Sequence, residues 1–246
     1  MKTVGIIPVR FQSTRFPGKA LVDIKGKSMV ERVYRQASAA DGLEKVLVAT
    51  DHQSIYDHVM DFGGEVCMTS QQHPSGTDRC REAMEQLEHT YDFVVNIQGD
   101  EPFIDPRQID TLVDGLDGSV QIATQARKIE QFEKLSDPNC VKVIMDGNSK
   151  ALYFSRTPLP YLRNVPPDKW LEQFDFYQHI GLYAYHVDVL REITELPVSN
   201  LEKAEGLEQL RWIENGYSIK VLATNYHADG IDTPEDLERA IGMHVN

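Results

Sequence analysis

The sequence has few cysteines, no long apolar run and no signal-peptide pattern. Its three cysteines, Cys67, Cys80 and Cys140, are odd in number and lack metal-site spacing, so we expect reduced thiols and neither a disulfide framework nor a zinc site. No apolar run approaches the roughly 18 residues of a membrane-spanning helix. The first residues run directly into a predicted strand, without the n-region and apolar h-region of a secreted protein. These absences predict a soluble, cytoplasmic protein.

Basic residues are also in short supply. The 246 residues include 25 Lys and Arg against 38 Asp and Glu, which gives a formal charge of −13. Nucleic acids and anionic membranes both require a basic face on the protein, so neither is expected as a partner. An anionic substrate has to be held by a local group of cations.

Two common nucleotide-binding signatures are missing, because the chain has neither G-x-x-x-x-G-K-[ST] nor G-x-G-x-x-G. Classical ATPase and dinucleotide-binding folds are therefore disfavoured. Strand-like and helix-like segments nevertheless alternate through the first half, with strands expected over 44–50, 65–68 and 91–97. A polar loop is expected over 69–79, with a helix after it. This alternation is typical of βαβ units and predicts an α/β fold with a doubly wound, mainly parallel sheet. We treat residues 1–246 as one domain with an inserted region at about 150–190.

From about residue 120 the pattern changes. Strands are predicted over 120–126, 141–145 and 180–186, and a proline-rich, aromatic excursion covers 157–176. Its four prolines are incompatible with regular structure across much of the excursion. Three interpretations stay open: a lid, a dimer arm, or a loop packed on the core of its own chain. Beyond it, the spacing predicts a helix over 201–215, a strand over 217–224 and a helix over 233–243.

A donor-rich loop follows the first apolar run. It carries three cations and two hydroxyl side chains: Arg10, Arg15, Lys19, Ser13 and Thr14. A loop of this kind at the carboxyl edge of a sheet suits a polyphosphate. Because Arg10 and Lys19 lie at opposite ends of the loop, they can embrace a triphosphate from two sides. The alternative is a solvated basic turn.

Two aspartates are candidates for a magnesium site. Asp100 directly follows the predicted strand over 91–97, where a carboxylate points into the crevice at the sheet edge. In the segment 232–236, Thr233 is predicted to cap a helix with Asp236 at its third position, which leaves Asp232 outside the helix for another task. Magnesium in phosphate-handling sites is typically held by one or two carboxylates plus phosphate oxygens and water. A turn-forming role for Asp100 is the alternative.

Further polar residues follow in the second half of the chain. Arg156 precedes the proline-rich excursion, where a guanidinium could clasp a carboxylate bidentately. His179 stands before a predicted strand, and Glu208 lies on the predicted helix over 201–215. A packing role for His179 and a solvated helix face for Glu208 are the alternatives.

Nine motifs together resemble one family, the 3-deoxy-D-manno-octulosonate (Kdo) cytidylyltransferases, over essentially the whole chain. They are IIPVRFQSTRFPGKAL at 6–21, VATDH at 48–52, SGTDR at 75–79, NIQGDEP at 96–102, NCVKV at 139–143, ALYFSRTPLP at 151–160, HIGLYAY at 179–185, LEQLR at 207–211 and GIDTPEDLERA at 230–240.

The resemblance implies a Rossmann-like nucleotidyltransferase that transfers CMP from CTP to the anomeric hydroxyl of Kdo, releases pyrophosphate, uses Mg²⁺ and serves lipopolysaccharide biosynthesis. It also implies a homodimer, and a sugar-binding or dimerisation role for the inserted region. By position in the motifs, the nucleotide would be bound by Arg10, Ser13, Thr14, Arg15, Lys19, Ser75, Gly76 and Thr77. The sugar acid would be bound by Gln98, Arg156, His179, Tyr183 and Glu208. The metal would be held by Asp100 and Asp232, and the catalytic residues would be these two aspartates together with Arg10 and Lys19.

Other functions stay open on the sequence. The substrate could be a related sugar acid, such as 8-amino Kdo or a sialate. Some residues depart from the family pattern, including His186 after the HIGLYAY motif, and these departures concern the identity of the sugar. A nucleotide-binding regulatory module without turnover is the alternative from another class.

Overall fold

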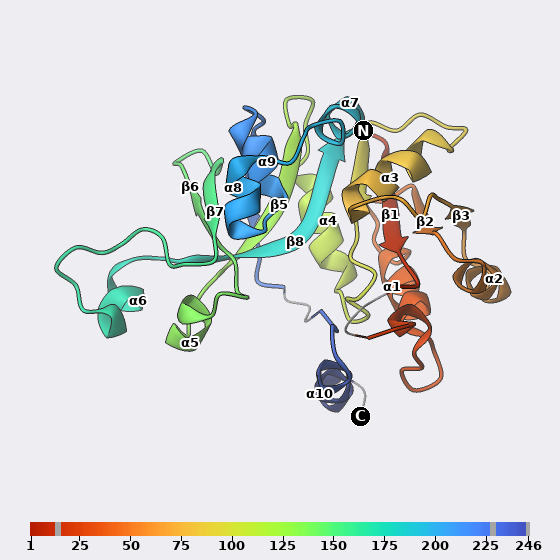
Figure 1. Ribbon diagram of the computed structural model, residues 1–246, viewed down its shortest axis with the longest axis horizontal. Coiled ribbons are helices and arrows are strands. Elements are labelled where there is room, and N and C mark those ends of the chain that lie inside the picture. The colour runs from red at the N-terminus through yellow and green to blue at the C-terminus, as the bar shows by residue number, and fades with distance from the viewer. Residues whose placement is uncertain (13–15, 227–229, 245–246) are drawn as a thin grey trace. The chain divides into compact units, whose positions relative to one another are not determined.

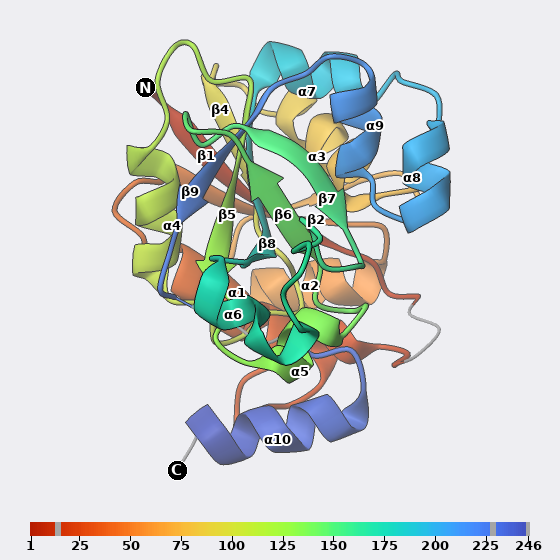
Figure 2. The ribbon, with the colours of Figure 1, turned by 90° about the vertical axis from the view of Figure 1, so that its left-hand side faces the viewer.

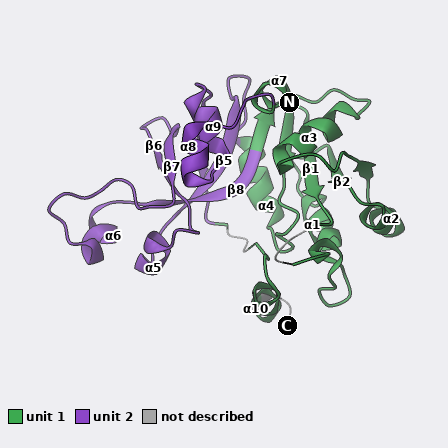
Figure 3. Cartoon of the chain, viewed as in Figure 1, with its two compact units in different colours: residues 1–114, 184–194, 226–246 green, residues 115–183, 195–225 purple. Residues whose placement is uncertain are grey.

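The computed structural model describes residues 1–12, 16–226 and 230–244 (Figure 1). The chain forms two compact units, shown in different colours in Figure 3. Unit 1 comprises Met1–Asp114, Ala184–Thr194 and Tyr226–Asn246, and unit 2 comprises Gly115–Tyr183 and Glu195–Asn225. The inserted region predicted at about 150–190 lies mostly within unit 2, which is larger than that prediction.

Unit 1 contains four parallel strands in the order β3-β2-β1-β4. They are β1 (Thr3–Val9), β2 (Lys45–Thr50), β3 (Val66–Met68) and β4 (Phe93–Asn96). Every residue of β1 and β4 is buried except Pro8, which is half-buried. Continuous burial of this kind is expected for parallel strands covered on both faces. The predicted α/β fold class with a mainly parallel sheet is confirmed.

The helices of unit 1 follow the predicted alternation. They are α1 (Met29–Ala37), α2 (Gln53–Asp61), α3 (Gly76–Glu85), α4 (Pro106–Asp114), α7 (Val187–Ile193) and α10 (Pro234–His244), with a short 3₁₀ helix η1 (Lys19–Leu21). The boundary predicted for α3 is wrong. Ser75 caps this helix, because its Oγ accepts the Thr77 and Asp78 amide hydrogens. Residues 76–79 therefore form the first turn of a helix and are not part of the preceding loop.

The start of α10 agrees with the prediction. The Thr233 Oγ1 accepts the Asp236 amide at 3.2 Å, and the Asp236 carboxylate accepts the Thr233 amide at 3.0 Å. This reciprocal pair is a capping box in which aspartate replaces the usual Glu or Gln. Asp232 lies outside the helix, as expected. The segment is anchored by Ile231, which is fully buried in a cluster with Ile24, Met29 and Ala240.

Unit 2 combines parallel and antiparallel pairing (Figure 2). β5 (Ile122–Lys128) pairs in parallel with β9 (Ile219–Ala223), while β6 (Lys142–Met145) pairs antiparallel with β7 (Ala151–Ser155) and with the first residues of β8 (Tyr177–His186). β7 was not predicted as a strand. The single helix predicted over 201–215 is two helices, α8 (Asn200–Glu205) and α9 (Gln209–Glu214). Gly206 ends α8 in the left-handed region, with φ of 63°, a conformation that glycine adopts without steric cost.

The proline-rich excursion packs on the core of its own unit. It contains the 3₁₀ helix η2 (Pro167–Lys169) and α6 (Trp170–Gln173), and α5 (Phe132–Ser136) precedes it in the chain. Trp170 and Phe176 stack with ring centroids 6.1 Å apart and join a buried cluster with Leu135. The excursion therefore packs partly on its own chain, and the lid and dimer-arm interpretations stay predictions. Within the described part of the chain, no helix has both the length and the apolar character needed to cross a membrane.

An ion pair joins α8 to α9. The Arg211 guanidinium donates to both carboxylate oxygens of Glu202, at 2.7 and 2.6 Å, and the two side chains are only 10 and 14% exposed. Hydrogen bonding from Arg211 holds the pKa of Glu202 below its ordinary value. A carboxyl group with a depressed pKa stabilises the folded state above the ordinary glutamate pKa, and this stabilisation is lost as pH falls through the folded pKa.

We expect Arg211→Met to lower the free energy of unfolding at pH 7 by about 3 kcal/mol, because it leaves a mostly buried carboxylate without its partner. The loss should shrink at a pH low enough to protonate Glu202 in the folded state, which lies below the ordinary glutamate pKa. Urea unfolding at the two pH values measures both effects. Arg191→Met is the matched control, since the Arg191–Asp188 pair is exposed and should contribute less than about 1 kcal/mol. Equal losses in the two variants would contradict the assignment.

Candidate active site

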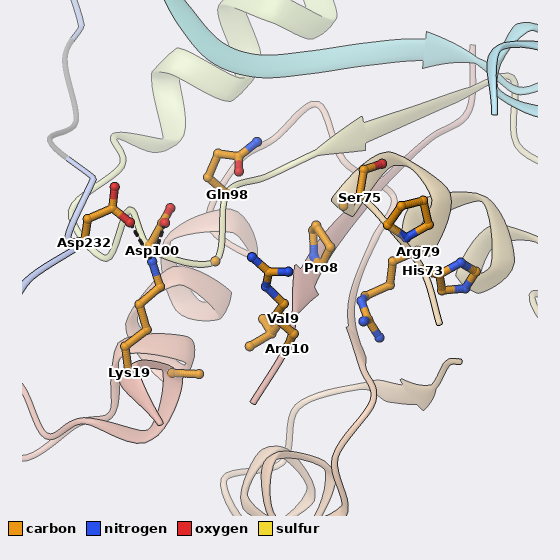
Figure 4. Close-up of a pocket in the computed structure, with 14 residues that line it drawn as sticks. Pro8, Val9, Arg10, Lys19, His73, Ser75, Arg79, Gln98, Asp100 and Asp232 are labelled. Carbon is orange, nitrogen blue, oxygen red and sulfur yellow. Dashed lines mark hydrogen bonds and ion pairs between the residues drawn. The ribbon is translucent and has the colours of Figure 1, made fainter. Parts of the chain in front are cut away.

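A cavity of about 400 Å³ lies within unit 1 (Figure 4). This volume is in the range of small-molecule binding sites. The cavity is lined by the end of β1 and the residue after it (Pro8, Val9, Arg10), by Lys19 and Ala20, by the approach to α3 and its first turn (His73, Pro74, Ser75, Gly76, Arg79), by the turn after β4 (Gln98, Gly99, Asp100), and by Asp232.

The parallel register brings these segments together. β1 pairs with β4 from Thr3↔Phe93 to Ile6↔Asn96, so both strands end at the same edge of the sheet. The chain after β1 therefore meets the turn after β4, as expected for a ligand crevice at the carboxyl ends of parallel strands. Gly99 permits the close approach, because a Cβ there would lie 2.9 Å from Val9 Cγ2 and 3.1 Å from the Pro8 carbonyl oxygen. A larger residue would push the turn away from β1.

The two predicted metal ligands converge. The Lys19 ammonium contacts Asp100 Oδ2 at 2.7 Å and Asp232 Oδ1 at 3.1 Å, and it also donates to the Ile231 carbonyl oxygen at 3.2 Å. Figure 4 shows both carboxylates turned toward this ammonium group. The Ile231 amide donates to the Asp100 carbonyl at 2.9 Å. Main-chain and side-chain contacts thus join residues 132 positions apart in the sequence (232 minus 100).

The donor set suits a hard divalent cation. Two carboxylates contact a single cationic group. Mg²⁺ in phosphate-handling sites commonly binds one or two carboxylates together with phosphate oxygens and water. In the described part of the chain, no set of three His, Cys, Asp or Glu side chains converges on one point. A metal held by two carboxylates would keep positions open for phosphate oxygens and water.

Arg10 is the exposed cation of the cavity. Its side chain lies between the Lys19 group and the residues at the start of α3 in Figure 4. Among the described residues it forms no ion pair, so its guanidinium is available to an anion. Of the predicted loop donors, Arg10 and Lys19 line the cavity, whereas Ser13, Thr14 and Arg15 lie outside the described residues.

A second arginine is held in the wall. Arg79 is 4% exposed, and it donates from Nη2 to Asp51 Oδ2 at 2.9 Å and from Nη1 to the Thr69 hydroxyl. The other Asp51 oxygen accepts the Phe11 amide at 3.2 Å. Phe11 also stacks on His52, with ring centroids 3.9 Å apart. The VATDH segment therefore anchors the chain just after Arg10.

The SGTDR segment forms the wall at the start of α3. Ser75 and Gly76 line the cavity, but the Ser75 Oγ is engaged in helix capping and donates to Asp78 Oδ2 at 2.6 Å. Thr77 is buried, at 3% exposure, and is outside the set of lining residues. Their predicted contact with the nucleotide stays a prediction.

The predicted sugar-binding residues belong to different units. Gln98 lines the cavity of unit 1, whereas Arg156, His179, Tyr183 and Glu208 belong to unit 2. The Arg156 guanidinium donates to the main-chain carbonyls of Glu205 at 2.7 Å, Pro138 at 3.0 Å and Gly206 at 3.4 Å. It therefore ties three segments together, and a bidentate grip on a carboxylate would use its remaining N–H groups.

His179 is a neutral group. Burial lowers its pKa to about 3, so it carries no charge at physiological pH. Its Nε2 lies 3.1 Å from the Thr124 Oγ1, whose single hydrogen can go to the carbonyl of Ile180 or Leu182. Nε2 is then the donor and Nδ1 the acceptor. Tyr183 is buried beside it, with ring centroids 5.3 Å apart. Glu208 is half-buried at the N-cap of α9.

Sequence reasoning missed several lining residues, notably His73 and Arg79. Arg79 belongs to a quoted motif, and it lies four positions after Ser75 on what proves to be the first turn of α3. Recognising Ser75 as the N-cap of α3 would have placed Arg79 one helical turn later, on the same side of the helix as Ser75. His73 pairs with Glu82, an arrangement that depends on the loop geometry and has no local sequence signal.

Residues 4–220 match the family described as Cytidylyltransferase. The 3-deoxy-manno-octulosonate cytidylyltransferase of Parabacteroides distasonis is 53% identical over 251 residues, covering 100% of this chain and 99% of the relative. The enzyme of the same description from Cytophaga hutchinsonii is 52% identical over 237 residues, covering 96% of this chain and 95% of the relative.

Solved structures agree. The structure of CMP:2-keto-3-deoxy-manno-octonic acid synthetase complexed with CTP is 41% identical in sequence and has a TM-score of 0.92. The match covers 99% of this chain and 98% of the synthetase chain. The 4-diphosphocytidyl-2C-methyl-D-erythritol synthase of Anaerococcus prevotii has a TM-score of 0.62 at 14% identity, which shows a shared fold alone. The chain belongs to the cytidylyltransferase family and, within it, to the 3-deoxy-manno-octulosonate cytidylyltransferases.

Proposed function

We propose that this protein transfers CMP from CTP to the anomeric hydroxyl of Kdo, giving CMP-Kdo and pyrophosphate. The convergence of Asp100 and Asp232 on one cation, in the same cavity as Arg10, carries the proposal. A triphosphate needs cations, and phosphoryl transfer needs carboxylates that hold a metal. Both are present within one cavity of unit 1. The full-length similarity to relatives with this name supports the choice of substrates.

The reaction is an in-line displacement at the α-phosphorus. The anomeric oxygen forms a bond to that phosphorus while the bond to the bridging oxygen of the β-phosphate breaks, and the hydroxyl proton is lost to solvent. Mg²⁺ held by Asp100 and Asp232 would neutralise phosphate charge and lower the pKa of the attacking hydroxyl. Arg10 would stabilise the departing pyrophosphate. Positioning of two polar substrates can supply roughly 7 to 11 kcal/mol of the barrier.

The sugar-acid contacts of Arg156, His179, Tyr183 and Glu208 in unit 2, and that of Gln98 in unit 1, are each proposed from their positions in the motifs. Because His179 is neutral, it would bind a sugar hydroxyl through a hydrogen bond and would not pair with the carboxylate. Arg156 is left as the cation for that carboxylate. This division of roles follows from the low pKa of His179.

A homodimer in the cytoplasm completes the proposal. Tyr161 and Phe174, on the excursion over 157–176, are 74 and 39% exposed, which is unusual for aromatic side chains and is typical of a contact surface. The free cysteines Cys67, Cys80 and Cys140 are compatible with a reducing compartment. Sedimentation equilibrium tests the dimer independently of activity.

Pyrophosphate release tests the proposed reaction. With CTP and Mg²⁺, we expect release to depend on Kdo and to be at least tenfold slower with sialic acid at equal concentration. The 8-amino derivative of Kdo is the second comparison, since it separates two sugar acids that differ at one position. No release with any sugar acid, despite CTP binding, would favour a regulatory module.

Asp100→Asn should reduce turnover about 10²- to 10³-fold, the usual cost of losing one group that stabilises the transition state. CTP affinity should change much less, because Arg10 remains. Turnover at saturating substrate and CTP binding are measured separately. Asp114→Asn, at the exposed end of α4, is the control and should behave as wild type. Near-normal turnover in Asp100→Asn would remove this carboxylate from the mechanism.

A further inference from the structure

We infer that Lys19 is a positioning residue for the two carboxylates and that it must release them when a divalent cation binds. This inference rests on the proposed function, because it concerns the same metal site. It adds a role to Lys19 that differs from direct contact with the triphosphate.

The ammonium group of Lys19 is saturated. A lysine ammonium has three N–H donors and no acceptor. Its three acceptors are Asp100 Oδ2 at 2.7 Å, Asp232 Oδ1 at 3.1 Å and the Ile231 carbonyl oxygen at 3.2 Å. No donor is left for a phosphate oxygen in this arrangement. Lys19 can contact a triphosphate only after giving up at least one of these acceptors.

Charge explains why the group lies there. Asp100 and Asp232 are both part-exposed, at 28 and 42%, and two converging carboxylates repel each other. The ammonium contributes one positive charge between the two carboxylates, whereas a divalent cation in the same place contributes two. A divalent cation and the ammonium therefore compete for the same oxygens.

The anchoring of the two aspartates favours exchange over collapse of the site. Asp100 and the 231–232 segment stay connected by the main-chain bond from the Ile231 amide to the Asp100 carbonyl, at 2.9 Å, and Ile231 is fully buried. Lys19 instead reaches the site on a long flexible side chain, and such a chain can move without displacing the backbone. When the metal arrives, the ammonium is released toward the cavity, where phosphate oxygens can accept its hydrogens.

The test compares Mg²⁺ affinity in the full chain without nucleotide or sugar, by isothermal titration calorimetry. Lys19→Met removes the competing charge and retains the side-chain bulk, so we expect about tenfold tighter Mg²⁺ binding than in wild type, the order expected for two part-exposed ion pairs. Lys19→Arg keeps the charge and should bind Mg²⁺ no more tightly than wild type. Asp100→Asn should weaken binding. Equal or weaker Mg²⁺ affinity in folded Lys19→Met, checked by circular dichroism, would overturn the inference.

A second measurement uses the wild-type protein. Amine acylation, read by mass spectrometry, should modify Lys19 faster when Mg²⁺ is present, because the ammonium is then released. The exposed Lys27 is the internal control and should not change. A Lys19 rate that Mg²⁺ leaves unchanged counts against the inference. Both measurements omit CTP and sugar, so failure of CMP transfer would not alter them, and failure of the exchange would leave CMP transfer intact.

Discussion

The candidate site depends on one shared cation. Two aspartates from distant parts of the chain approach each other closely enough to contact the same ammonium group. Their mutual repulsion makes this arrangement unfavourable unless a positive charge lies between them. Lys19 supplies that charge in the absence of a metal. The proximity of the two carboxylates is therefore stabilised by the ammonium group that they share.

Two kinds of packing bring these aspartates together. The parallel pairing of β1 and β4 fixes where the turn with Asp100 lies, and Gly99 allows that turn to approach β1 closely. Asp232 is positioned differently. Its neighbour Ile231 is buried, and the next residue, Thr233, forms the capping box at the start of α10. The acidic pair thus combines one residue fixed by sheet topology with another fixed by a helix start.

Local signals explain which parts of this arrangement could be predicted. Thr233, Pro234 and Asp236 form a helix start within a few residues, so the place of Asp232 just outside the helix could be deduced from the sequence. Asp100 and Asp232 were expected to share a magnesium site, but the packing that brings them together, the nonlocal burial of Ile231, has no local sequence signal. The loop expected over 69–79 overlooks a helix start, because Ser75 and Asp78 have the [ST]-x-x-[DE] spacing of a capping box, and the Ser75 Oγ accepts the Thr77 and Asp78 amide hydrogens.

Unit 2 gives a second example of a contact that local sequence signals do not reveal. The helix predicted over 201–215 has helical periodicity throughout, yet Gly206 ends α8 in a left-handed conformation. The resulting break allows the Arg156 guanidinium to reach the carbonyls of Glu205 and Gly206. Helical spacing alone cannot show that these carbonyls have a partner elsewhere in the chain.

The distribution of charge also narrows what each group can recognise. Arg79 is paired with Asp51, and Lys19 is paired with the two aspartates. On the proposed function, Arg10 would be the first cation that a triphosphate meets in the described part of the cavity. On the inferred exchange, Lys19 would join once a divalent cation has taken its place. In a protein with a net charge of −13, this order has a physical advantage, because a metal-bound nucleotide approaches with less negative charge than the nucleotide alone.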